Sequence, residues 1–232
     1  MWVDEGSVDG APRKRKSAGR RSAGAVRVRA PQLVDLVGAK RAARLEERLS
    51  DAATAYAAER YPDARRILAP IAEEVPDLAE VRELYGLTLY RLGRWRDATR
   101  ELEAFVDLTG GSTEQHPVLA DCRRALGQYG KVDELWEELR TASPSGALVA
   151  EGRIVAAGAL ADQGKLADAV ALLGKGFKLP KRPMDHHLRR AYALADLYER
   201  SGDLPQARSL FTQIARSDPD FLDAAERAAG LG

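Results

Sequence analysis

The sequence predicts an all-α protein in which helix–turn–helix hairpins repeat along the chain and stack into a solenoid. Two observations support this prediction. A short motif returns at intervals of 34 to 38 residues over most of the 232 residues. Alanine, the residue with the best intrinsic helix propensity, occurs 40 times. Each predicted hairpin carries apolar residues on two sides that it cannot bury alone, so neighbouring hairpins are expected to pack against one another.

The motif consists of a glycine, one further residue, a large apolar residue, two mostly polar residues and a small apolar residue. Its four copies start at Gly93, Gly130, Gly164 and Gly202, and a degenerate copy starts at Glu59. Glycine at this place permits the left-handed backbone of a tight turn between two helices. The copies end at residues 64, 98, 135, 169 and 207. These spacings predict surface insertions near residues 110–112 and 181–183.

Further positions share the same register. A small residue in the middle of the first helix allows the facing helix to approach closely, and this position holds Ala52, Gly86, Ala157 and Ala195, with Arg123 as the departure. The second helix carries a large apolar residue at Leu68, Leu102, Leu139, Leu173 and Phe211. Helix-ending prolines follow at Pro76 and Pro219. With its period of 34 residues, this pattern resembles the tetratricopeptide repeat (TPR) family, and the resemblance implies a right-handed superhelix of about five repeats.

The predicted elements follow in order along the chain. Residues 1–30 form a basic tail, and residues 31–232 form the repeat array. Pro31 suits the first turn of an N-terminal capping helix, and Asp220 is a candidate N-cap for the C-terminal one. The expected repeats are 45–78, 79–112, 116–149, 150–183 and 188–221, and the expected C-terminal cap helix is 222–229.

Charge is distributed unevenly along the chain. The formal net charge is +1, but residues 1–30 hold eight Arg and Lys against three Asp and Glu. A stretch of Gly, Ser, Ala, Pro and Arg cannot bury enough apolar surface to offset its ordering entropy, so the tail is predicted to be disordered. It is either a solvated tail or a segment that neutralises the phosphates of a nucleic acid. The candidate anion-binding residues are Arg13, Lys14, Arg15, Lys16, Arg20 and Arg21.

Composition excludes several classes of protein. No apolar run approaches the ~20 residues that a membrane-spanning helix needs, and a single cysteine rules out an intramolecular disulfide. The acidic opening residues and the missing apolar run argue against a signal peptide, so a cytoplasmic location is expected. The chain has 28 Arg against 8 Lys and no Asn. That skew favours a bacterial source with a GC-rich, actinobacterial-like genome.

The residues that could carry chemistry do not combine into a known catalytic or metal-binding motif. His116 and the adjacent His186 and His187 are expected in surface turns, because no Cys/His spacing suggests zinc. Cys122 falls at an inward-facing helical position and is expected to be a buried structural thiol. The glycines near Lys165 lack the spacing of a phosphate-binding loop. We therefore expect no enzyme, no cofactor, no metal and no small-molecule substrate.

The remaining candidate is a binding surface. In the TPR family the first helix of each repeat lines a concave groove, and the resemblance places six candidate peptide-binding residues there: Tyr56, Glu83, Tyr90, Arg124, Tyr192 and Asp196. Tyrosine and arginine are enriched at binding hot spots. The sequence thus favours a non-catalytic scaffold or adaptor that binds a protein or peptide in its groove. The alternative is a ribosome-, RNA- or DNA-associated protein that docks through its basic tail.

Overall fold

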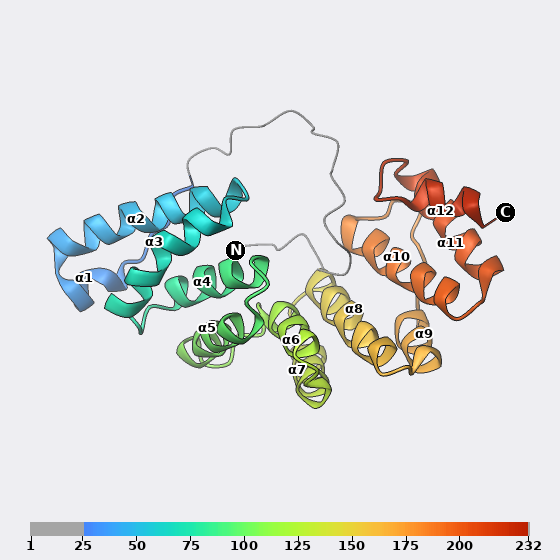
Figure 1. The fold of residues 1–232 in the computed structure, drawn as a ribbon, viewed down its shortest axis with the longest axis horizontal. Helices are drawn as coiled ribbons and strands as arrows, with labels where there is room; N and C mark the ends of the chain where they lie inside the picture. The colour runs from blue at the N-terminus through green and yellow to red at the C-terminus, as the bar shows by residue number, and fades with distance from the viewer. Residues whose placement is uncertain (1–25, 232) are drawn as a thin grey trace. The chain divides into compact units, whose positions relative to one another are not determined.

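The structure is a computed structural model that describes residues 26–231, and this part of the chain is folded entirely into α-helices and their connections (Figure 1). The helices of the described part are α1 (Gln32–Val37), α2 (Ala39–Ala57), α3 (Tyr61–Glu74), α4 (Ala79–Arg91), α5 (Trp95–Leu108), α6 (His116–Ala125), α7 (Tyr129–Ala142), α8 (Gly146–Asp162), α9 (Leu166–Gly174), α10 (Asp185–Arg200), α11 (Leu204–Ser217) and α12 (Ala224–Gly230). No helix between residues 26 and 231 is long and apolar enough to cross a membrane.

The chain divides into two compact units, where the sequence predicted one array. Unit 1 extends to Leu126 and contains α1 to α6, and unit 2 begins at Gly127 and contains α7 to α12. Within unit 1 each helix packs against the next one in the sequence. Within unit 2, α10 packs against both α8 and α9, and then pairs with α11, which is covered by α12. Both units are therefore built from helical hairpins that pack on their neighbours.

The turns between paired helices have the predicted left-handed backbone. Gly93, Gly164 and Gly202 have φ angles of 69°, 76° and 84°. The degenerate first copy of the motif makes the same turn with a non-glycine residue, because Glu59 has φ 58°. A residue with a Cβ is sterically strained in this conformation. Glu59 thus occupies the glycine position of its turn at a cost in stability.

The third turn corrects the predicted register. The left-handed residue is Gly127, with φ 70°, whereas Gly130 lies inside α7. Val132 therefore occupies the small apolar position and is fully buried, and Leu135 is only half-buried. Val132 lies 34 residues after Ala98 and 37 before residue 169. The prediction failed because two glycines three residues apart are each followed by a plausible motif, and only the turn geometry distinguishes them.

The shift of three residues removes the apparent exception in α6, the first helix of the third repeat. Ala120, which is 3% exposed, takes the small-residue position in place of Arg123. The buried Trp136 takes the large-residue position in place of Leu139. In this register the interval of 37 residues separates Val132 from Ala169, so the three extra residues lie after Val132 and not near residues 110–112 as predicted. The revised third repeat starts three residues earlier than 116.

One close approach between helices requires glycine. In α4 a Cβ on Gly86 would lie 2.7 Å from both Cγ and Cδ2 of Leu102, which is fully buried in α5. Protein interiors are close-packed, so a buried leucine has little room to move away from an added methyl group. This contact explains why the small-residue position of the second repeat holds glycine.

The folded part begins before the predicted boundary at residue 30. Residues 26–30 run alongside α2, where the backbone N–H groups of Val26, Val28 and Ala30 donate hydrogen bonds to side-chain oxygens. The acceptors are Thr54 Oγ1 at 3.0 Å, Ser50 Oγ at 3.1 Å and Glu46 Oε1 at 3.1 Å. The candidate tail residues from Arg13 to Arg21 lie outside the described residues, so the tail remains a prediction.

The capping helices differ in detail from those predicted. Pro31 directly precedes α1, where Leu33 is fully buried and Val34 and Leu36 are each 49% exposed. Helix α12 begins at Ala224, two residues later than expected. Asp220 is not its N-cap, because Asp223 precedes the helix and makes no side-chain capping bond.

Candidate functional site

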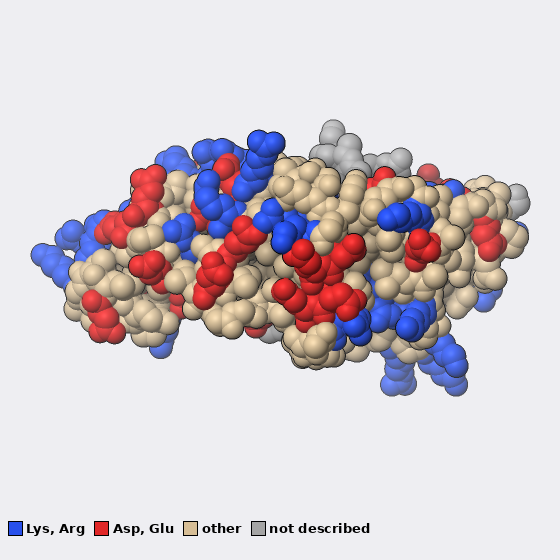
Figure 2. All heavy atoms as spheres, turned by 90° about the horizontal axis from the view of Figure 1, so that it is seen from below, with Lys and Arg blue, Asp and Glu red and all other residues tan. Residues whose placement is uncertain are grey.

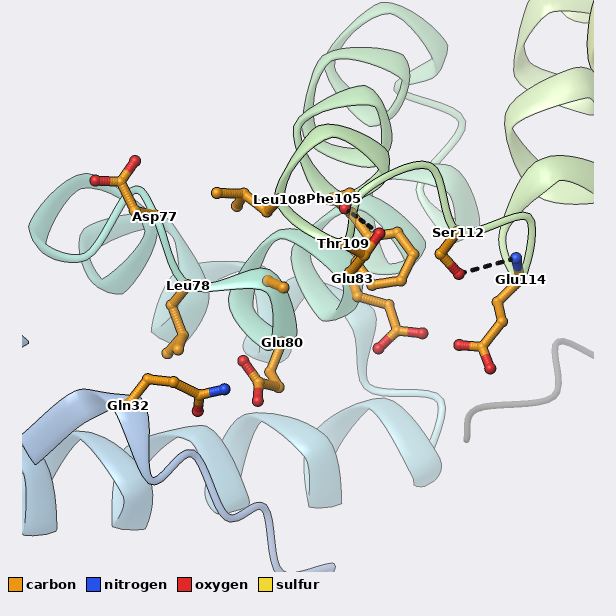
Figure 3. A pocket seen from close by; sticks show the side chains of 11 residues that line it. Gln32, Asp77, Leu78, Glu80, Glu83, Phe105, Leu108, Thr109, Ser112 and Glu114 are labelled. Carbon is orange, nitrogen blue, oxygen red and sulfur yellow. Dashed lines mark hydrogen bonds between the residues drawn. The ribbon is translucent and has the colours of Figure 1, made fainter.

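Unit 1 contains an open pocket of about 460 Å³ with an acidic lining. It lies between the start of α4, the end of α5 and the loop that leads to α6, with one residue from α1 beside them (Figure 3). The lining residues are Gln32, Asp77, Leu78, Ala79, Glu80, Glu83, Phe105, Leu108, Thr109, Ser112 and Glu114. This volume is in the usual range for a ligand site, roughly 300–1,000 Å³.

The helical register places two of the carboxylates on the same face of α4. Glu80 and Glu83 are three residues apart in the first turns of the helix, so their side chains project to one side. The positive end of the helix dipole favours carboxylates there. In the close-up the carboxylates of Glu83 and Glu114 point into the same space, and Glu80 points toward Gln32 (Figure 3). The pocket therefore gathers negative charge from two elements.

The environment of Glu83 opposes its ionisation. Burial raises the pKa of its carboxyl group above the ordinary value of 4.5, and the negative charges of Glu114 and Glu80 act in the same direction. A hydrogen bond from Gln115 Nε2 to Glu83 Oε1, 2.8 Å long, acts the other way. Burial and the two neighbouring carboxylates thus outweigh the groups that favour ionisation of Glu83.

Glu80 has an unsatisfied hydrogen-bond acceptor. Its Oε2 atom is buried and has no hydrogen-bond partner among the described residues. A buried polar atom without a hydrogen bond costs about 1–3 kcal/mol. The described residues that line the pocket include four carboxylates and no Lys or Arg. Chemically, the arrangement is suited to bind a cation that also donates hydrogen bonds.

Only one of the six predicted groove residues, Glu83, lies in this pocket. Tyr90 is 3% exposed, and its hydroxyl donates a 2.8 Å hydrogen bond to Asp121 Oδ2. Its ring packs edge-on against Trp95. The Arg124 guanidinium reaches the other oxygen of Asp121 at 3.4 Å. Tyr90 and Arg124 thus meet at Asp121 inside unit 1, and the hydrogen bond of Tyr90 joins α4 to α6.

The two predicted groove residues of unit 2 are likewise engaged within the chain. The Tyr192 hydroxyl donates to Asp223 Oδ1 over 2.5 Å and accepts from Arg227 Nη1 over 3.0 Å. Asp196 accepts from Arg227 Nη2 over 2.8 Å. Burial raises the pKa of Tyr192 to about 12, and its bond to Asp223 adds to this rise. Although burial opposes it, hydrogen bonds to Asp196, Tyr192 and Glu199 raise the pKa of Arg227. These side chains attach α12 to α10.

The remaining groove candidate, Tyr56, lies at the end of α2. Its ring packs edge-on against that of Tyr61, with the centroids 5.4 Å apart. This contact spans the turn between α2 and α3, on which Glu59 also lies. Tyr56 is therefore not brought together with Glu83 in the pocket.

Sequence reasoning missed Glu114 because of the register error. In the corrected register Glu114 lies 34 residues after Glu80 and occupies the same groove position in the next repeat. The predicted repeat began at residue 116 and left Glu114 in a linker. For Glu80, nothing in the sequence indicates that one of its oxygens is buried without a hydrogen-bond partner among the described residues. The turn at Gly127 is the signal that would have identified Glu114.

The titratable residues singled out for chemistry have structural surroundings. His116 is 2% exposed, so the expected surface position is wrong. His187 Nδ1 accepts a 3.0 Å hydrogen bond from the backbone N–H of Met184 at the start of α10. Cys122 is fully buried as predicted, and burial raises the pKa of its thiol. Between residues 26 and 231 no group of three or more His, Cys, Asp and Glu is placed to hold a metal ion.

The fold is TPR-like, as comparison with solved structures shows. No protein-family profile matches the chain, and no curated protein matches it in sequence. TTC0263, a thermophilic TPR protein of Thermus thermophilus, has a TM-score of 0.61 and 22% identity over 81% of this chain and 98% of that one. TPR-like repeats of a Podosopora anserina protein assigned as a kinesin light chain have a TM-score of 0.59 and 17% identity over 75% and 97% of the two chains.

A third solved structure with the same arrangement of helices belongs to a larger protein. It is a monomeric mutant of IFIT1 with m7Gppp-AAAA, and it has a TM-score of 0.54 and 15% identity over 81% of this chain and 46% of that one. All three identities are below the level at which a shared ligand follows from a shared fold, since one fold supports many functions. The binding function of this chain therefore has to be argued from its own residues.

Proposed function

We propose that the chain is a non-catalytic protein-interaction module whose acidic pocket in unit 1 takes a lysine or arginine side chain of a partner. The observation that supports the proposal most is the pair of carboxylates on α4. Glu80 has a buried oxygen without a hydrogen-bond partner within residues 26–231, and the pKa of Glu83 is raised. An incoming ammonium or guanidinium group supplies both the hydrogen bonds and the positive charge that these two groups lack.

The shape of the pocket supports a side chain of a peptide as the ligand. Phe105 and Leu108 give the lining an apolar part beside the carboxylates. Lysine and arginine bury their methylene stems against apolar surface while their charged ends reach polar partners. A volume of about 460 Å³ is large enough for one such side chain and neighbouring backbone. The sequence predicted a peptide or protein ligand in a groove, and we propose more specifically that a cationic segment of this ligand binds near Glu83.

The proposal leaves the other expectations from the sequence as they were. We expect the module to act without a cofactor or a small-molecule substrate, in the cytoplasm of a bacterium with a GC-rich genome. These statements derive from composition and from the resemblance to the TPR family. Docking through the basic tail remains the alternative mode of association, and a protein partner does not require it.

Binding of an oligo-arginine peptide tests the proposal. We expect the double variant Glu80→Gln with Glu83→Gln to lose at least about tenfold in affinity, since each charged hydrogen bond contributes roughly 1.5–3 kcal/mol when formed. Isothermal titration calorimetry at neutral pH measures the affinity. An oligo-glutamine peptide of the same length serves as the uncharged probe.

The control variant is Glu47→Gln with Asp51→Asn, because both residues are exposed on α2 and the change in net charge is identical. It is expected to bind oligo-arginine within about twofold of the unmodified chain, as surface ion pairs contribute little. Equal losses in the two double variants would mean that the peptide responds to net charge alone. That result would reject the pocket as the binding site.

A further inference from the structure

Unit 2 has a basic surface around the end of α9 that plays no part in the proposed binding at the acidic pocket. We define the α9 edge as Arg153, Lys175, Lys178, Lys181, Arg182 and Arg190. Lys and Arg side chains gather on this part of unit 2, at the lower right of Figure 2, whereas Asp and Glu gather over α7 near the centre of that view. The ten residues from Lys175 to Met184 contain four cations and no carboxylate.

Arg190 forms the fixed centre of this surface. Its Nε and Nη2 atoms donate to the carbonyl oxygen of Leu173 over 3.0 and 2.6 Å, and Nη2 also donates to the carbonyl oxygen of Lys175 over 2.9 Å. Its guanidinium lies over the ring of Phe177, 5.2 Å from the centroid. Arginine here caps the last carbonyls of α9, which is a favourable place for a cation. The end of α9 thus holds a guanidinium in one orientation.

Arg153 also approaches the carbonyl group of Lys175, but few of its N–H groups have a hydrogen-bond partner among the described residues. Its Nη1 lies 3.4 Å from the oxygen of Lys175, and its guanidinium lies over Trp136 at 5.6 Å. Its Nε atom is buried and has no hydrogen-bond partner among the described residues. A guanidinium has five N–H donors, so most of those on Arg153 are available. The neighbouring Arg189, in contrast, pairs with Glu151 at 2.9 Å.

The two guanidiniums repel each other without a carboxylate to compensate within residues 26–231. Burial lowers the pKa of Arg153 from its ordinary value. Burial also lowers the pKa of Arg190, and the positive charge of Arg153 lowers it further. Burial disfavours the charged form of both guanidiniums, and at Arg190 a neighbouring cation adds to this effect. An anion between them would supply the missing counter-charge.

We propose that the α9 edge binds the phosphate backbone of a nucleic acid. The remaining Nη donors of Arg153 receive one phosphate group, because the planar guanidinium matches phosphate oxygens. The charge of Arg190, whose Nε and Nη2 stay bound to backbone carbonyls, attracts the same phosphate. The exposed side chains of Lys175, Lys178, Lys181 and Arg182 neutralise the phosphates on either side. This surface belongs to the folded part of the chain and is separate from the predicted basic tail.

A nucleic acid fits these observations better than an acidic protein. The cations are spread along an extended loop instead of surrounding a pocket, and phosphate contacts of that kind need no sequence readout. The chain also carries a second basic segment, between Arg13 and Arg21, so its cations are not confined to one short site.

The test uses the full chain and a single-stranded oligouridine of about 20 nucleotides, with affinity measured by fluorescence anisotropy at about 50 and about 200 mM salt. The loop variant replaces Lys175, Lys178, Lys181 and Arg182 by Gln. It is expected to lose about tenfold or more in affinity, and the slope of log K against log salt is expected to flatten by up to about three. A DNA duplex of the same length shows whether RNA or DNA is preferred.

The control variant replaces Lys40, Arg44, Arg65 and Arg66 by Gln, which removes four exposed cations from unit 1. Its affinity for oligouridine is expected to stay within about twofold of the unmodified chain. An equal loss in both variants would overturn the proposal. The proposal is also overturned if replacing Arg13, Lys14, Arg15 and Lys16 abolishes binding on its own, or if polyglutamate of matched charge binds as tightly as the oligouridine.

The variant Arg153→Gln tests whether the half-buried guanidinium contributes to binding apart from the cations of the loop. It removes the poorly satisfied guanidinium and leaves the hydrogen bonds of Arg190 in place. We expect a loss of about threefold to tenfold in affinity for oligouridine, with the salt slope reduced by about one. Unchanged affinity with an unchanged slope would exclude a phosphate at this position.

Discussion

The guanidinium of Arg227 donates to the carboxylate of Asp196 over 2.8 Å and so attaches the last helix, α12, to α10. A second bond from the same nitrogen, 2.7 Å long, reaches Glu199. The guanidinium also lies over the ring of Phe211, 4.3 Å from its centroid. The face of α10 that the TPR resemblance assigned to a peptide is thus occupied by residues that hold the end of the chain. Asp196 and Tyr192 stabilise unit 2 in this structure.

Replacing Arg227 by Ala is expected to destabilise unit 2. The change removes the hydrogen bonds to Asp196, Glu199 and Tyr192, at a cost of about 2 kcal/mol. Glu199 then loses its salt bridge, whereas Asp196 keeps Arg200 at 3.7 Å. Urea unfolding followed by circular dichroism measures the effect. Arg208→Ala, an exposed arginine on α11, is the control and is expected to change stability by less than about 0.5 kcal/mol. Similar effects of the two variants would show that Arg227 does not hold α12.

The register of the third hairpin predicts opposite effects for two glycines. Gly127→Ala places a Cβ in a left-handed turn and is expected to cost about 1 kcal/mol. Gly130→Ala lies inside α7 with no atom within 4 Å of the new Cβ, and it is expected to gain about 0.5–1 kcal/mol from helix propensity. Thermal or urea unfolding of both variants measures these changes in stability. The reverse order of stability would restore Gly130 as the turn residue.

The first turn offers a complementary substitution. Glu59 has φ 58°, which glycine adopts without steric cost. Glu59→Gly is therefore expected to raise the free energy of unfolding by up to about 1 kcal/mol. Glu47→Gly, inside α2, is the opposite case and is expected to lower it by about 1 kcal/mol. A destabilising Glu59→Gly would mean that this residue is not held in the left-handed conformation.

Tyr90 is expected to behave as a core residue. It is 3% exposed, and Tyr90→Ala removes its ring from the contact with Trp95, so a loss of about 3 kcal/mol in stability is expected. Tyr90→Phe keeps the ring but removes the bond to Asp121, and a loss of about 1–2 kcal/mol is expected. Urea denaturation measures the free energy of unfolding of both variants. A Tyr90→Ala variant of unchanged stability would indicate an exposed groove residue.

The raised pKa of Glu83 predicts how stability depends on pH. The folded chain binds this proton more tightly than the unfolded chain does, so stability falls as the pH rises from 4.5 through the folded pKa of Glu83. Glu83→Gln keeps a neutral side chain at every pH and is expected to be more stable than the unmodified chain near neutrality, but not below pH 4.5. Urea midpoints measured across this range test the difference. A variant that is less stable at neutral pH would contradict the burial of an uncompensated charge.

The helical hairpins could be predicted from the sequence because they follow from local patterns. The glycines at 93, 164 and 202 mark turns, and the apolar residues at Leu68, Leu102 and Leu173 mark the buried face. The third hairpin was shifted because Gly127 and Gly130 fit the same motif, and only the backbone conformation separates them. Local pattern therefore predicts that a hairpin exists better than it predicts its register.

The acidic pocket could be predicted only in part, because it depends on which side chains find partners. Glu83 was expected in a groove on the basis of its position alone. Tyr192 and Asp196 occupied equivalent positions, but Arg227, 31 residues after Asp196, binds them instead. A carboxylate of α4 that lacks a partner and one of α10 that has a partner look alike in the sequence. The distinction needs the long-range contacts of the folded chain.

Zero-length carbodiimide crosslinking of an oligo-lysine peptide tests the central claim most directly, since it joins an amine only to a carboxylate that it touches. If the pocket binds a lysine side chain, crosslinks are expected at Glu80, Glu83 or Glu114, identified by mass spectrometry of the digested product. The chain provides its own competing surface, because α7 carries four exposed carboxylates at Asp133, Glu134, Glu137 and Glu138. Crosslinks confined to α7, with none in the pocket of unit 1, would show that the acidic pocket does not bind the cationic side chain.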